Sequence, residues 1–316
     1  MTSTTQPAAM RAATPSRPRP LARATRTALV GVVMGLLACG AMAAGFPLTV
    51  SDDLGRAVTL DERPLRIVSL APSHSESVCA LEACDRLVGV DRHSDHPAEL
   101  VELASLGDAF APDLEAIVML RPDLVLVDEY SSVHLALEPL GITVFAGTPQ
   151  TYDETLAFLT LLGTMLGAEE RAAELVAEIE ATVADVAARV AGAERPTVFF
   201  ELDSTPYSVG PNSFIGQVLD MAGAENIVTA SMGDFPQVDP EFVVLADPAF
   251  IVLSDAPFGE SAASVAARPG WGGLAAVTGG RVVELSVEQV NLVSRAGPRI
   301  GHAVELLARL FHPDLF

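Results

Sequence analysis

A short pattern of residues occurs twice in this 316-residue chain, once in each half. The first copy is DLEAIVMLRPDLVLVD, beginning at Asp113, and the second is DPEFVVLADPAFIVLSD, beginning at Asp239. Each copy predicts a helix that begins at an Asp cap, carries Glu in its first turn, ends before a Pro and leads into a buried strand. The matching positions are Asp113/Asp239, Glu115/Glu241 and Pro122/Pro248. We therefore expect the chain to contain two related halves.

Around these copies, β-branched apolar runs alternate with longer amphipathic stretches. Ile67–Leu70 and Val198–Glu201 each lead through a loop into a helix, which extends the correspondence between the halves. Strands that alternate with helices indicate an α/β fold with mostly parallel sheets. The candidate strands are Arg66–Leu70, Arg86–Val90, Leu124–Val127, Val144–Ala146, Thr197–Glu201, Phe250–Leu253 and Arg281–Glu284.

A long amphipathic helix is predicted between the halves. Residues 168–191, AEERAAELVAEIEATVADVAARVA, have apolar side chains at intervals of three and four residues. We interpret this segment as a single backbone helix that joins two similar lobes, with a ligand cleft between the lobes. The expected divisions are residues 44–65 for an N-terminal hairpin, 66–167 for the N-terminal lobe, 168–191 for the interlobe helix and 192–316 for the C-terminal lobe.

The first 43 residues have the composition of a secretory signal peptide. They carry five arginines and no acidic residue, and an uncharged run extends from Ala28 to Ala44. Ala41-Met42-Ala43 has the Ala-x-Ala form of a signal-peptide cleavage site. Residues 1–43 are therefore predicted to direct export to the periplasm. Two alternatives stay open, a retained membrane anchor and a lipoprotein box that ends at Cys39.

The remaining residues are strongly acidic. They carry 14 arginines against 41 acidic residues, a net charge of −27, and the chain contains no lysine. Such a surface repels nucleic-acid phosphates, so no DNA or RNA partner is expected. It suits a partner with basic patches, or solubility in a salty medium.

The motifs that mark catalytic sites are absent from the sequence. It has no G-x-S-x-G elbow, Walker A loop, G-x-G-x-x-G or H-E-x-x-H. His93 and His96 lie in a polar loop without a placed third ligand, so no metal site, cofactor or enzyme activity is expected. Ser73 and Glu76 have the spacing of a capping box, which predicts Ser73 as a helix N-cap.

Two cysteines, Cys79 and Cys84, lie five positions apart near a predicted helix end. In an oxidising compartment they could form a disulfide. Because side chains at i and i+5 diverge on a continuous helix, the bridge requires the helix to end before Cys84. Two separate buried thiols are the alternative.

Five blocks of the sequence, in this order, resemble the periplasmic cobalamin-binding proteins of ABC importers, within the larger iron-siderophore, haem and B12 solute-binding group. The blocks are RIVSLAPSHSES…CDRLVGVDRHSDHP, DLEAIVMLRPDLVLV, VGPNSFIGQVLDMAGAENI, PQVDPEFVVLADP and SRAGPRIGHAVELLA. The resemblance implies a monomeric, non-enzymatic carrier. It also implies that Glu115 and Glu241 dock onto arginines of the permease dimer in the membrane. Taken alone, both glutamates could simply be first-turn acids that offset a helix dipole.

The resemblance also implies a ligand-binding set. The matching positions are His93, Asp128 beside Tyr130, Leu202, Tyr207, Phe235, Asn291 and Arg295. His93 stands where an aromatic residue is usual in the family, and Asn291 stands where an acid is usual. The implied cargo is cobalamin or a related corrinoid, with haem or a ferric siderophore as the alternative. For Arg295 a structural salt bridge is the alternative to ligand binding.

Overall fold

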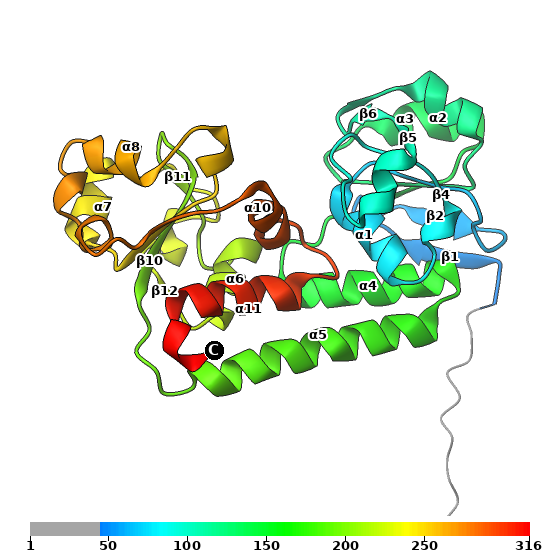
Figure 1. Ribbon diagram of the computed structural model, residues 1–316. Coiled ribbons are helices and arrows are strands. Elements are labelled where there is room, and N and C mark those ends of the chain that lie inside the picture. The colour runs from blue at the N-terminus through cyan, green and yellow to red at the C-terminus, as the bar shows by residue number, and fades with distance from the viewer. Residues whose placement is uncertain (1–44) are drawn as a thin grey trace, which may run out of the picture. The chain divides into compact units, whose positions relative to one another are not determined.

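Residues 45–316, which the computed structural model describes, contain two five-stranded sheets, one in each lobe (Figure 1). The predicted signal peptide and Cys39 lie outside the described residues. Between positions 45 and 316 no helix combines the length and the apolar character needed to cross a membrane. The expected hairpin precedes the first sheet as two antiparallel strands, β1 (Leu48–Ser51) and β2 (Ala57–Leu60).

The sheet of the N-terminal lobe is parallel throughout. Its spatial order is β5 (Ala104–Ser105), β4 (Leu87–Val90), β3 (Ile67–Ser69), β8 (Leu124–Val127) and β9 (Val144–Ala146). Every position of β3, β8 and β9 is buried, as expected for strands covered on both faces. The helices of this lobe are α1 (Pro72–Ala80), α2 (Leu114–Leu120), α3 (Val133–Leu137) and α4 (Tyr152–Leu166).

The sheet of the C-terminal lobe is built around β10 (Thr197–Asp203). On one side of β10 lie β13 (Phe250–Leu253) and then β14 (Val282–Glu284), both parallel. On the other side, β12 (Glu225–Asn226) pairs in parallel with its start and β11 (Tyr207–Ser208) pairs antiparallel with its end. The helices are α6 (Phe214–Met221), α7 (Pro240–Ala246), α8 (Ala262–Ala267), α9 (Ala275–Thr278), α10 (Val287–Ser294) and α11 (Ile300–Phe311).

The repeated sequence pattern has the same structure in both lobes. Helix α2 and strand β8 begin and end 126 positions before α7 and β13. The side chain of Asp113 caps α2 by accepting from the backbone of Ala116, and Asp239 caps α7 by accepting from Glu241. Both helices end at a non-glycine residue in the left-handed conformation, Arg121 and Asp247, and a proline follows each. The sequence predicted this helix–turn–strand unit correctly.

Helix α5 (Glu169–Val190) occupies the position predicted for the backbone helix. Its buried face packs against α4 of the N-terminal lobe and α11 of the C-terminal lobe, and Figure 1 shows it running alongside both. The α4–α5 contact depends on Gly163, because a Cβ there would lie only 2.4 Å from the Cβ of Ala172. One hydrophobic cluster extends from α5 into both lobes. The helix therefore packs in a core that extends into both lobes.

Helix α1 differs from its sequence-based prediction. It begins at Pro72, its N-cap is Ala71, and no side chain caps it. The expected capping box of Ser73 and Glu76 is thus wrong, because a proline at the first helical position places Ser73 inside the helix. The helix ends at Ala80, and the chain then turns so that Cys84 meets Cys79 in a disulfide. The helix therefore ends before Cys84, as the spacing of the two cysteines requires for a disulfide.

Candidate ligand-binding site

A cavity of about 340 Å³ lies between the two lobes. The N-terminal lobe contributes the start of α1 after β3, Asp128 after β8 and the loop after β9. The C-terminal lobe contributes the start of α6, Phe235 and the turn after α10. The loops after β3 and β9 are at the carboxyl ends of parallel strands, the usual place for ligands in α/β sheets. The lining residues are 71–74, Asp128, 147–150, Phe214, Ile215, Phe235 and 294–296.

One wall of this cavity is formed by His74, which is fully buried in α1. Its ring stacks on Phe158 of α4, with 4.8 Å between the ring centroids. Burial lowers the pKa of His74 to about 4, because desolvation penalises the charged imidazolium. At neutral pH the wall is therefore an uncharged aromatic surface.

A buried carboxylate, Glu76, holds the lobes together beside the cavity. Its oxygens accept hydrogen bonds of 2.7 Å from Nε and Nη2 of Arg299, at the start of α11. A further hydrogen bond of 2.8 Å comes from Nη1 of Arg295. The three side chains are between 3% and 17% exposed, so solvent screens their charges weakly.

Arg295 makes two more contacts across the cleft. Its Nη1 lies 2.7 Å from Oδ1 of Asp95, and its Nη2 donates to the backbone carbonyl of His93. Asn291 donates a hydrogen bond of 3.0 Å to the other oxygen of Asp95. The structural salt bridge expected as one alternative for Arg295 is present, and the same residue also lines the cavity. Arg295 and Arg299 together contact the two carboxylates of Glu76 and Asp95, so their positive charges are neutralised.

Some residues of the predicted ligand-binding set line the cavity and others do not. Phe235, Arg295 and Asp128 are among its lining residues. Asn291 instead lines a neighbouring cavity of about 330 Å³ with Asp95 and Arg299. The side chains of His93, Tyr130 and Tyr207 are exposed and do not line the central cavity.

Sequence reasoning missed the cavity wall formed by Pro72, His74, Phe214 and Ile215. For Pro72 and His74 a usable signal existed, because the segment after β3 had to lie at the carboxyl edge of the sheet.

The two predicted docking glutamates lie at equivalent positions near the starts of α2 and α7. Both side chains are exposed, and among the residues the structure describes neither Glu115 nor Glu241 has a hydrogen-bond or ion-pair partner for its carboxylate. A cavity of about 530 Å³ lies beside Glu241, with Val244 and Trp271 on its wall. Both carboxylates are thus free to bind a cation.

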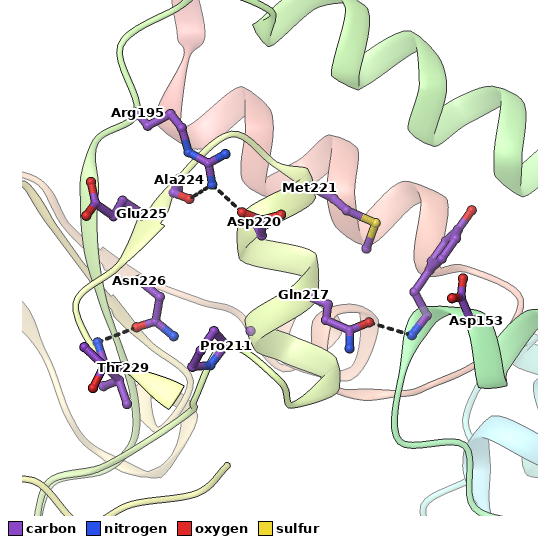
Figure 2. Close-up of a pocket in the computed structure, with 13 residues that line it drawn as sticks. Asp153, Arg195, Pro211, Gln217, Asp220, Met221, Ala224, Glu225, Asn226 and Thr229 are labelled. Atoms are coloured by element: carbon purple, nitrogen blue, oxygen red, sulfur yellow. Dashed lines mark hydrogen bonds and ion pairs between the residues drawn. The ribbon is translucent and has the colours of Figure 1, made fainter. Parts of the chain in front are cut away.

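A larger cavity of about 560 Å³ is bordered by α6, β12 and the start of α4 (Figure 2). Figure 2 shows Arg195 reaching both Asp220 and the backbone oxygen of Ala224. Gln217 accepts a hydrogen bond of 2.9 Å from the backbone of Tyr152. None of the predicted ligand-binding residues lines this cavity.

Across residues 45–316 no group of three or more His, Cys, Asp and Glu is placed to hold a metal ion.

The family model described as periplasmic binding protein matches residues 67–288. The chain belongs to this family. Bacillus subtilis has a relative named as an ABC transporter substrate-binding lipoprotein, YvrC, which is 33% identical over 86% of this chain and 87% of its own length. A cobalamin-binding protein of Halobacterium salinarum is 32% identical over 64% of this chain and 57% of its own length.

The fold has solved counterparts. The periplasmic vitamin B12-binding protein BtuF of Vibrio cholerae aligns with a TM-score of 0.66 and 26% identity, covering 79% of this chain and 97% of that one. The family and the two-lobed α/β fold expected from the sequence are therefore confirmed for this periplasmic binding protein.

Proposed function

We propose that this periplasmic binding protein captures cobalamin or a related corrinoid in the interlobe cleft and delivers it to an ABC importer. Its relatives include proteins named for cobalamin, for vitamin B12 and for ABC transport. Export would use residues 1–43 as a signal peptide and leave the protein in the periplasm, or anchored through Cys39 as a lipoprotein. It would act as a monomeric carrier and not as an enzyme.

We favour a corrinoid as the cargo because the cation that lines the cleft is already neutralised. Arg295, which lines the cavity, is bound to Glu76 and Asp95, and Asp128 adds a further acid to the lining. An anionic ligand, such as haem with its propionates, would meet no unpaired cation among these lining side chains. A corrin ring carries neutral amides around an apolar face, so it fits the uncharged wall of His74 and Phe235 better.

We propose that three exposed aromatic residues extend this surface beyond the cavity itself. Phe235 is 55% exposed, Tyr207 is 42% exposed and Tyr130 is 67% exposed, so each has a ring face free to cover a large planar ligand. With His93, Asn291 and Arg295 they make up the ligand-binding set that we propose. A cavity of about 340 Å³ would hold part of a corrin, and these residues would cover the rest.

Delivery would depend on the two free carboxylates. We assign Glu115 and Glu241 to docking, because they occupy equivalent points on two repeated units and lack partners within residues 45–316. A permease dimer related by a two-fold axis offers two equivalent arginine sites, which suit two equivalent carboxylates. The net charge of −27 outside the signal segment would favour approach to such a basic surface.

Spectral titration tests the cargo. The purified protein is titrated with cyanocobalamin, haemin and a ferric hydroxamate at equal ionic strength. We expect saturable binding of cyanocobalamin at sub-micromolar concentration and much weaker binding of the other two. Tighter binding of haemin or of the hydroxamate would replace the corrinoid with the alternative cargo of the same group.

A further inference from the structure

We propose that each docking carboxylate has an apolar neighbour that also binds the permease, Met119 on α2 and Leu245 on α7. This inference rests on the proposed docking role of Glu115 and Glu241. The partner it requires is a permease dimer that presents, on each subunit, a guanidinium beside a shallow apolar depression.

Each docking glutamate is followed by an apolar residue about one helical turn later. Met119 follows Glu115 by four residues, and Leu245 follows Glu241 by four. Residues four apart lie on the same face of a helix, about one turn from each other. Each lobe therefore presents one carboxylate and one apolar side chain side by side.

Both of these apolar side chains are highly exposed. Met119 is 81% exposed and Leu245 is 86% exposed, among the highest values for large apolar residues in the described part of the chain. A single exposed apolar residue needs no explanation. Here, however, two stand at equivalent positions of a repeat whose copies differ at Ala116/Phe242 and Arg121/Asp247.

Both helices are held firmly. Ile117 and Val243, at equivalent positions on the opposite side, are fully buried in the cores of their lobes. An Asp side chain caps each helix at its start, and a left-handed residue ends it. The carboxylate and its apolar neighbour are thus presented on a fixed support, which lowers the entropy lost on binding.

Charge and apolar contact would affect different rates of docking, association and dissociation respectively. Long-range attraction between the acidic protein and a basic permease surface raises the association rate and falls with salt. Burial of Met119 and Leu245 acts only after contact, so it slows dissociation. The two contributions can therefore be separated by kinetics.

The experiment measures association and dissociation rates between the full protein and its cognate ABC importer in lipid nanodiscs, at low and at moderate salt. For the double variant Met119→Ser/Leu245→Ser we expect the dissociation rate to rise at least tenfold, while the association rate and its salt dependence stay as in the wild type. For Glu115→Gln/Glu241→Gln we expect slower association and a weaker salt dependence.

The control is Leu140→Ser/Leu315→Ser, which removes one exposed apolar side chain from each lobe at positions outside α2 and α7. It should bind like the wild type. Wild-type dissociation by the Met119/Leu245 variant, with the glutamine variant still impaired, would overturn the apolar contact and leave the docking glutamates standing. Wild-type behaviour by both variants would overturn the docking role as well. Unchanged thermal unfolding and cyanocobalamin titration show that each variant is folded.

Discussion

Arg299 donates two hydrogen bonds of 2.7 Å to the carboxylate of Glu76, and so connects α11 of the C-terminal lobe to α1 of the N-terminal lobe. Arg295 binds the same carboxylate from the turn after α10. These contacts join the two lobes beside the cleft, and the carboxylate of Glu76 faces both guanidinium groups.

Removing the charge of Glu76 should be costly. Glu76→Gln leaves two largely buried guanidinium groups short of a partner, so we expect the free energy of unfolding to fall by about 3–5 kcal/mol. Denaturant unfolding measures this. The control is Asp185→Asn, which breaks an exposed pair with Arg189 on α5 and should cost about 0.5 kcal/mol or less. Equal losses in the two variants would contradict the role given to Glu76.

Acid should destabilise the protein through His74. Its pKa is about 4 when folded and 6.5 in a model peptide, because burial disfavours the imidazolium. Between these values the unfolded chain binds more protons, so stability present above pH 6.5 is lost as the pH falls towards 4, by up to about 1.4 kcal/mol per pH unit. In His74→Phe, which cannot titrate, this part of the pH dependence should disappear. An unchanged slope in His74→Phe would contradict the effect assigned to His74.

Asp255 should make the protein less stable as the pH rises, which is opposite in sign to the effect of His74. Burial, and then the nearby Glu201, raise the pKa of its carboxyl to about 7, and neither oxygen has a hydrogen-bond partner within the described residues. The folded protein therefore holds this proton at a pH where the unfolded chain has lost it. The resulting stability is greatest below about pH 4 and is lost as the pH rises to about 7.

The variant Asp255→Asn isolates this effect. We expect it to gain stability relative to the wild type at pH 8, and the gain should shrink as the pH is lowered towards 4. Thermal or urea unfolding across this range measures the difference between the two proteins. A difference that does not change with pH would show that Asp255 titrates normally.

The sequence predicted most of the fold because strong local patterns dominate it. Apolar runs marked β3, β8 and β13, and Asp caps marked α2 and α7. The two-residue strands β11 and β12 were missed, since so few residues show no periodicity.

The site was harder to predict because its contacts join distant parts of the chain. The spacing of Ser73 and Glu76 favoured a capping box, but the partners of Glu76 are Arg295 and Arg299, more than two hundred residues away. Only the fold brings them together. Phe235 and Arg295 were predicted through the family resemblance, whereas the wall formed by His74 was missed although its segment follows β3 at the carboxyl edge of the sheet.

We propose that the interlobe cleft binds a corrinoid. Calorimetric titration with cyanocobalamin tests it in three proteins, the wild type, Phe235→Ala in the cleft and Phe258→Ala, an equally simple loss of an exposed ring (88% exposed) that does not line the cavity. We predict tight one-to-one binding by the wild type and Phe258→Ala, and at least tenfold weaker binding by Phe235→Ala. Absence of binding by the wild type, or equal affinity in all three proteins, would contradict the account.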